Sequence, residues 1–214
     1  TIGSSTPNSG SGDGEFNFPR GMTFDSSGNL YVVDQNNYRV QKFDSSGNYV
    51  SQFGTSGTGQ GQFSEPNNIA IDSLGNIYVS DSGNDRIQKF DSDGNFISYI
   101  GESGTGPGQL DYPVGLHIDS SGYLYVADRN NHRIEIFDSN GDYYTQVGSY
   151  IGSGGELNSP VYVVTNSLGD IFVSDTTNKL HKFVIPQYEY NSAKGPVVNS
   201  TLGGFMTVMN AYVD

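Results

Sequence analysis

Residues 61–90 read GQFSEPNNIAIDSLGNIYVSDSGNDRIQKF, and a closely similar pattern recurs along the chain at a step of 47 residues. Proline, aspartate, asparagine and glycine keep this step at one position each. The repeated positions are Pro19, Pro66, Pro113 and Pro160; Asp34, Asp81, Asp128 and Asp175; Asn37, Asn84, Asn131 and Asn178; and Gly28, Gly75, Gly122 and Gly169. A fixed period of roughly 20–50 residues is typical of arrays of one supersecondary unit. Residues found in every copy therefore build the unit, and residues that differ between copies mark candidate specific sites.

Each copy predicts four short strands joined by tight turns. In the first copy we expect strands at 21–25, 30–34, 39–43 and 49–53. Gly28 fits the left-handed position that closes a short hairpin. The second strand is apolar on both faces, because Leu30 and Val32 alternate with Tyr31 and Val33. Such a small sheet needs a neighbouring sheet on each face. We therefore favour radial packing of the sheets about an axis, which is the β-propeller arrangement, over a linear stack.

The second copy resembles an NHL repeat. The resemblance is carried by Gly61-Gln62-Phe63, Pro66, Ile71-Asp72, Gly75 to Val79, Asp81, Asn84 and Arg86 to Phe90. Copies one and three match equally well, whereas copy four has Asn166 in place of Asp and lacks one residue after Asn178, so that its Arg is replaced by Lys179 or lost. The resemblance covers about residues 14–186. It implies a propeller, commonly six-bladed, and a role as a platform for partners.

We therefore predict an all-β fold, a β-propeller of four-stranded antiparallel blades, over residues 1–186. Its repeats lie near 14–62, 63–109, 110–156 and 157–186. Six such blades need about 280 residues and the chain has 214, so a small closed ring and a partial ring completed by another chain both stay open. Residues 1–3 resemble the end of an outer strand and are a candidate closing strand for the last blade. The tail, 187–214, is expected to be a degenerate blade or a strand-donating arm.

Composition narrows the classes of function. The formal net charge of −13, with only ten Lys and Arg, opposes nucleic-acid binding, which some NHL domains show through basic faces. No apolar run reaches the length of a membrane span, so we expect no membrane insertion. The absence of cysteine excludes disulfides and thiolate metal sites. The Ser, Gly, Asn and Tyr bias favours an extracellular or cell-surface protein, and Asn199 stands in a candidate glycosylation sequon.

A charged set recurs in the copies and invites two interpretations. It consists of Asp34, Asp81, Asp128 and Asp175 with Arg39, Arg86 and Arg133. It could form a carboxylate–guanidinium site. We favour a structural role, in which each Asp ends a strand and each Arg–Asp pair ties a hairpin together.

In a propeller with this strand order, the connection into each first strand and the turn between the second and third strands share one face. Loops that vary on such a face are the usual place for a ligand. The residues predicted to bind a partner or ligand are Arg20, Tyr38, Asn67, Asp85, His117, Arg129 and His132. The opposite face, with its near-identical Asp-Ser-Ser-Gly-Asn turns, is expected to be generic.

The leading functional hypothesis is a non-enzymatic binding or scaffolding propeller. Its expected partners are a protein, a glycan or further copies of itself, and its atypical ends suggest self-assembly through terminal strands. We expect no catalytic residue, metal or cofactor, because no Gly-x-Ser-x-Gly motif is present and the three histidines are not spaced as a metal pair. The alternative is a metal-dependent enzyme of the lyase or lactonase type, which the resemblance implies would place its site at the central axis. His117, in a first strand, is its one candidate residue.

Overall fold

The computed structural model describes residues 10–148, 157–184 and 209–211. These residues form four antiparallel four-stranded sheets, which we call blades 1 to 4. Blade 1 is β1 (Pro19–Phe24), β2 (Leu30–Asp34), β3 (Arg39–Phe43) and β4 (Tyr49–Phe53). Blade 2 is β7 (Pro66–Ile71), β8 (Ile77–Asp81), β9 (Arg86–Phe90) and β10 (Phe96–Ile100). Blade 3 is β13 (Pro113–Ile118), β14 (Leu124–Asp128), β15 (Arg133–Phe137) and β16 (Tyr143–Val147). Blade 4 is β17 (Pro160–Thr165), β18 (Ile171–Asp175), β19 (Leu180–Phe183) and β20 (Met209–Ala211).

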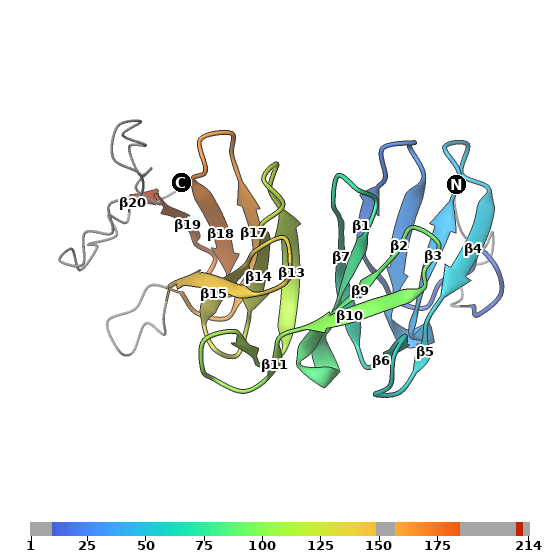
Figure 1. The fold of residues 1–214 in the computed structure, drawn as a ribbon, viewed down its shortest axis with the longest axis horizontal. Helices are drawn as coiled ribbons and strands as arrows, with labels where there is room; N and C mark the ends of the chain where they lie inside the picture. Colours follow the sequence, from blue (N-terminus) through green and yellow to red (C-terminus); the bar gives the residue numbers. More distant parts are fainter. Residues whose placement is uncertain (1–9, 149–156, 185–208, 212–214) are drawn as a thin grey trace.

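Each blade is a simple meander whose strand order follows the chain. Two short parallel pairs build the connections between blades: β5 (Thr55–Ser56) with β6 (Gln62–Phe63), and β11 (Glu102–Ser103) with β12 (Gln109–Leu110). The first strands pack on one another in sequence, β1 on β7, β7 on β13 and β13 on β17, and the blades fan out around them (Figure 1). The predicted β-propeller architecture is confirmed.

The sequence closes its hairpins through aspartate-led turns. In the first turn, Asp25 Oδ1 accepts the backbone N–H groups of Ser27 and Asn29 at 2.9 Å, and Gly28 adopts a φ of 81°. Aspartate that bonds its own following backbone favours this turn over continued strand, and glycine takes the left-handed position without a Cβ clash. The same arrangement recurs around Asp44, Asp72 and their equivalents.

The recurring Asp–Arg pairs have the predicted structural role. Arg39 Nε donates to the fully buried Asp34 Oδ2 at 2.8 Å, and the same guanidinium donates to the carbonyls of Ser11, Gly12 and Glu15 in the preceding connection. Arg86 and Arg133 make equivalent ion pairs with their aspartates at 2.8 and 2.9 Å. The Arg therefore joins the second hairpin of a blade to the loop that enters it.

Blade 4 departs from this pattern, and the predicted alignment of Asn178 with the asparagines of the other blades was wrong. Asn178 has a φ of 62° and occupies the left-handed position that Tyr38 and His132 hold in their blades, so it does not match Asn37 or Asn131 as the 47-residue step predicted. Lys179 does not take over the ion pair. Asp175 Oδ2 lies instead 3.0 Å from His181 Nε2. His181 holds the place of Gln41, as the sequence predicted.

The core consists of three apolar clusters, each between two neighbouring blades. Tyr31 and Val33 pack on Ile69, Val79 and other residues of blade 2. Equivalent clusters join blade 2 to blade 3 and blade 3 to blade 4. Alternating side chains of one strand therefore face two different neighbours, and this confirms that both faces of the inner blades are covered.

The two outer faces of the row of blades expose positions that are buried in the inner blades. Met22 in β1 is 61% exposed, whereas its equivalent in β7, Ile69, is 3% exposed. Leu180 in β19 is 45% exposed, whereas Val40 and Ile134 are fully buried. We call these surfaces, around Met22 and around Leu180, the blade 1 end face and the blade 4 end face.

The outer strand of blade 4 comes from the C-terminal part of the chain. β20 pairs antiparallel with β19, with Lys182 opposite Met209 and Leu180 opposite Ala211. Residues 1–3, the predicted candidate for this position, lie outside the described residues, as do most of the tail and Asn199. Within the described ranges, no helix is long and apolar enough to span a membrane.

Candidate binding surfaces

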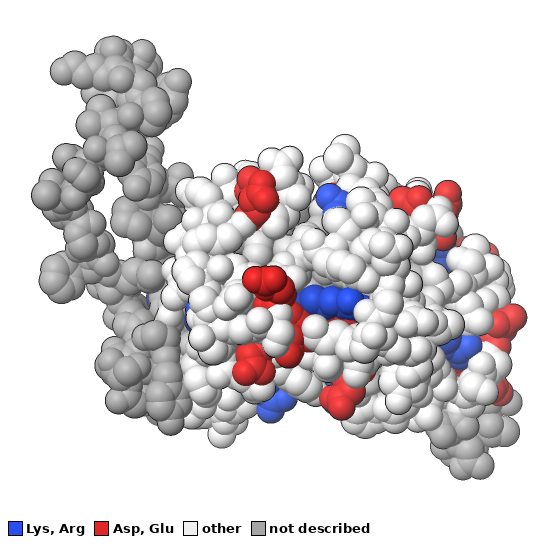
Figure 2. All heavy atoms as spheres, turned by 60° about the horizontal axis from the view of Figure 1, so that its bottom comes forward, with Lys and Arg blue, Asp and Glu red and all other residues white. Residues whose placement is uncertain are grey.

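The loop face carries the connections between blades and the short turns η1 (Gln35–Asn37) and η2 (Ser82–Asn84). It lies at the bottom of Figure 1, and Figure 2 brings it forward. A basic side chain lies near the middle of this face with acidic side chains beside it (Figure 2). Six of the seven residues predicted to bind a partner belong to elements at this face; His117 is the exception.

Four of these residues are held by contacts between or within blades. Arg20 Nε donates to Gln35 Oε1 at 3.1 Å, and its guanidinium stacks 4.2 Å from the Phe18 ring. Arg129 lies 5.8 Å from the ring of Tyr112, whose hydroxyl donates to Glu65 at 2.6 Å. Burial, followed by the bond to Glu65, raises the pKa of Tyr112. This part of the loop face is therefore a polar surface on which Arg20 and Arg129 lie over aromatic rings.

Asp85 and His132 link one blade to the next. Asp85 Oδ1 accepts the backbone N–H of Tyr112 at 2.8 Å, and His132 Nδ1 accepts that of Ser159 at 2.9 Å. Tyr112 and Ser159, whose N–H groups donate these bonds, each precede the proline of a first strand, and both have a positive φ. Tyr38 also has a positive φ, and Asn67 lies in β7. Asp85 and His132 therefore have a structural task that sequence variation alone did not reveal.

The cavity between blades 3 and 4 lies on the opposite face, among the hairpin turns, and has a volume of about 890 Å³. His117, Asp119, Tyr123, Tyr125 and Tyr144 of blade 3 line one side of it. The turn of blade 4 from Thr165 to Asp170 lines the other side. The sequence predicted a generic hairpin face, and the cavity lies on this face between blades 3 and 4.

On the blade 3 side of the cavity, four lining residues depart from the repeat: His117, Tyr123, Ile136 and Tyr144. The corresponding residues of the other blades are Thr23, Ala70 and Val164; Asn29, Asn76 and Asp170; Lys42, Lys89 and Lys182; and Val50 and Ile97. Each departure was readable from the sequence. Their convergence was not, because it depends on strand register, in which Tyr125 lies opposite both His117 and Ile136.

The departures remove partners that the other blades supply. In blade 2, Asp72 Oδ2 accepts Asn76 Nδ2 at 2.8 Å and the Tyr78 hydroxyl at 3.1 Å, and Lys89 lies over the Tyr78 ring. In blade 3, Asp119 Oδ2 keeps the bond from the Tyr125 hydroxyl at 3.1 Å. Tyr123 replaces the asparagine and has no side-chain amide to donate, so this carboxylate oxygen has acceptor capacity that its equivalents use internally.

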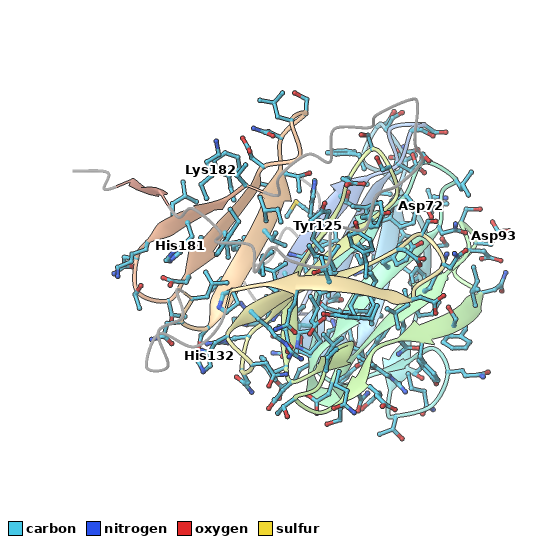
Figure 3. All side chains as sticks on the ribbon, turned by 60° about the vertical axis from the view of Figure 1, so that its left-hand side comes forward. Asp72, Asp93, Tyr125, His132, His181 and Lys182 are labelled. Atoms are coloured by element: carbon cyan, nitrogen blue, oxygen red, sulfur yellow. The ribbon has the colours of Figure 1, made fainter. Side chains whose placement is uncertain are left out.

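Aromatic rings and one histidine form the walls of the cavity. Tyr123 and Tyr144 have ring centroids 4.9 Å apart, and Tyr144 is 54% exposed. His117 Nε2 lies 2.9 Å from Thr165 Oγ1 across the blade boundary. Burial lowers the pKa of His117, so the ring is neutral at pH 7. Figure 3 shows Tyr125 inside the row of blades, with His132 nearer the loop face.

The cavity offers aromatic faces, a carboxylate and hydroxyl groups, which suit binding by stacking and hydrogen bonding. The described ranges contain no group of three or more His, Cys, Asp or Glu side chains that could hold a metal ion. His117, the one candidate for a metal at the axis, contacts Thr165 in this cavity.

Comparison with known proteins agrees with the geometry. Residues 21–91 match the family model of a 6-bladed β-propeller, so the class is that of propeller blades. Residues 110–137 match the NHL repeat model. The repeating units of this chain are therefore β-propeller blades, and the third is similar to an NHL repeat.

Matches to Caenorhabditis elegans proteins are local. The chain is 49% identical to protein lin-41 over 43 residues, which is 20% of this chain and 4% of lin-41. It is 47% identical to the RING finger protein nhl-1 over 45 residues, which is 21% of this chain and 5% of that protein. The chain thus spans a small fraction of both relatives.

Similar solved structures share the fold at low sequence identity. A streptogramin B lyase superposes with a TM-score of 0.60 and 18% identity, covering 87% of this chain and 58% of the lyase. Virginiamycin B lyase from Staphylococcus aureus, solved with quinupristin, gives a TM-score of 0.64 and 17% identity, covering 85% and 55% of the two chains. The chain spans just over half the length of these propellers.

Proposed function

We propose that the chain is a non-enzymatic binding and scaffolding propeller whose specific site is the cavity between blades 3 and 4. The observation that carries this proposal is the convergence of four departures from the repeat on one cavity. A blade needs none of them to fold, because its siblings form the same meander with other residues. Residues that leave the repeat pattern without serving the blade are best explained by a ligand or partner.

The proposal also includes where the protein acts and how copies of it assemble. The net charge of −13 and the Ser, Gly, Asn and Tyr bias support an extracellular or cell-surface setting, in which the partner is a protein or a glycan. Apolar side chains on the two end faces support association of copies end to end, the blade 4 end face of one chain on the blade 1 end face of the next. Such a head-to-tail contact is heterologous and builds a ring or a filament.

The binding proposal is tested with a panel of small amines, carboxylates and neutral saccharides, monitored by chemical-shift changes of the intact chain. The matched variant is Tyr123→Asn with Tyr144→Ile, which copies blade 2 at both positions. We expect at least one compound class to bind the parent chain and to lose binding in this variant. A control variant, Tyr143→Phe, copies Phe96 of blade 2 and should bind as the parent does. If no class depends on Tyr123 and Tyr144, the proposed site is wrong.

A metal-dependent lyase is the second candidate, and the fold similarity to streptogramin B and virginiamycin B lyases motivates it. That similarity is one of fold, and the described residues contain no group of three or more side chains that could hold a metal ion. Titration with Mg²⁺ and Zn²⁺ followed by a turnover assay on quinupristin separates the two candidates. Metal-dependent turnover that His117→Ala abolishes would favour the enzyme.

A further inference from the structure

Three of the four blades place a lysine over an aromatic ring of the second strand. Lys42 Nζ lies 5.0 Å from the centroid of the Tyr31 ring, and Lys89 Nζ lies 5.1 Å from that of Tyr78. In blade 4, Lys182 lies 5.7 Å from the Phe172 ring and 2.8 Å from Asp170 Oδ2. An ammonium over an aromatic face is attracted by the ring quadrupole, and a nearby carboxylate adds to this attraction. Blades 1 and 2 therefore place an ammonium over a tyrosine ring whose hydroxyl donates to an aspartate, and blade 4 adds a direct ion pair between the ammonium and a carboxylate.

Blade 3 keeps this site and lacks its cation. Ile136 stands where Lys42 and Lys89 stand, opposite Tyr125 in the strand register. Tyr125 still donates its hydroxyl to Asp119. The ring–carboxylate pair that receives a lysine in blades 1 and 2 is thus present without one, and this is the pair that lines the cavity.

The charges around the cavity favour a cation. No Lys or Arg lines it, and its two carboxylates are Asp119 and Asp170. Asp170 is paired with Lys182, and Asp119 has no basic partner among the described ion pairs. His117, the remaining titratable group besides the tyrosines, has its pKa lowered by burial and is neutral at pH 7. The cavity is therefore a negatively charged space with aromatic walls.

Two further rings extend the site toward solvent. Tyr123 replaces a hydrogen-bonding asparagine, and Tyr144 replaces Val50 or Ile97, so both substitutions add an aromatic face where the siblings have none. Several aromatic faces around one carboxylate are a common arrangement for recognition of organic cations.

We infer that the cavity between blades 3 and 4 binds a primary alkylammonium group, of the kind a lysine side chain carries, at the position that Lys42 and Lys89 occupy in their own blades. This inference rests on the proposed binding function and names the chemistry of its ligand. The ammonium group of the ligand takes the place of the lysine ammonium that blade 3 lacks, because Ile136 stands at the lysine position. Its alkyl chain contacts Ile136 and the tyrosine rings, and its ammonium reaches Asp119.

The test titrates the intact chain with n-butylammonium, a mimic of the lysine side chain, and with n-butanol as the neutral control of equal length. Ile136→Lys restores the sibling residue and should fill the site from within, whereas Ile136→Met keeps an uncharged chain of similar length. Blades 1 and 2 show that a lysine at this position is compatible with the fold. Thermal unfolding of both variants checks that each is folded.

We expect n-butylammonium to bind with a dissociation constant on the order of millimolar. Ile136→Lys should weaken it by at least roughly tenfold and Ile136→Met by less than about threefold, and n-butanol should bind far more weakly than the amine. Equal binding of n-butanol, or unchanged affinity in Ile136→Lys, would overturn the inference. Saccharide binding that needs Tyr123 and Tyr144, without amine binding, overturns the inference and leaves the proposed function standing. No ligand at the cavity overturns both.

Two further titrations identify the source of the ammonium group. Nα-acetyl-lysine amide presents a side chain as a partner protein would, and putrescine presents a free metabolic amine. Stronger binding of acetyl-lysine amide supports a lysine of a partner protein, whereas stronger binding of putrescine supports a small amine. Either result requires the same loss in Ile136→Lys.

Discussion

Glu135→Gln tests the electrostatics of blade 3 most directly. Glu135 is fully buried, and its Oε1 lies 2.9 Å from Arg133 Nε, the same nitrogen that lies 2.9 Å from Asp128 Oδ2. Two carboxylates thus share one guanidinium. Gln41 and Gln88 hold this position in blades 1 and 2, where the Gln88 amide donates to Asp81 at 2.9 Å. The substitution therefore restores a pattern that the same chain already uses twice.

The magnitude follows from the pKa. Burial raises the pKa of Glu135 from 4.5 to about 7, and Arg133 offsets only part of this effect. The folded state therefore binds more protons than the unfolded state between these values, so the free energy of unfolding falls as pH rises through this range. At ~1.4 kcal/mol per pKa unit, the loss is roughly 3 kcal/mol by pH 8. Glutamine carries no proton to lose, so the variant escapes this loss.

The assay is urea unfolding of the parent chain and Glu135→Gln at pH 5 and pH 8. Part of the loss has already occurred at pH 5, so the stability advantage of the variant should grow by roughly 2.5 kcal/mol between the two pH values. Gln88→Glu is the matched control, since it places the same shared guanidinium in blade 2 and should lose stability at pH 8 relative to pH 5. An advantage of Glu135→Gln that does not change with pH would refute the reasoning, because a packing or hydrogen-bond effect has no such slope.

Other predictions follow from the packing. Arg86→Ala leaves the fully buried Asp81 without its ion pair and should cost about 3–5 kcal/mol in urea unfolding, unlike an exposed charge. Gly115→Ala places a Cβ 2.3 Å from the Val161 carbonyl oxygen, so the unfolding free energy should fall by about 1–3 kcal/mol. Met22→Glu adds a charge to the blade 1 end face and should lower the mass measured by light scattering at high concentration; an unchanged mass would contradict end-to-end association.

Local chemistry in the sequence was enough for the blade itself. Gly28, the aspartate-led turns and the Arg39–Asp34 pair each depend on residues close in the chain, and the structure confirms all three. The fixed step failed at Asn178, because a deletion within a turn is resolved by backbone conformation, and asparagine accepts the left-handed position. The raised pKa of Glu135 was also beyond the sequence, since it depends on burial and on the sharing of Arg133.

Variation between copies pointed first to the loop face, where some varying residues serve the architecture. Asp85 and His132 differ from each other and from Tyr38. Yet Asp85 and His132 each accept the equivalent backbone N–H, that of the residue before the first-strand proline of the following blade. Variation there exchanges one acceptor for another and leaves the architecture unchanged. At Tyr123 and Ile136, by contrast, an amide donor and a cation are lost, and a cavity lies beside them. In a repeat protein, a departure that keeps the contact of its siblings is structural, whereas one that removes the contact beside a cavity indicates a ligand from outside.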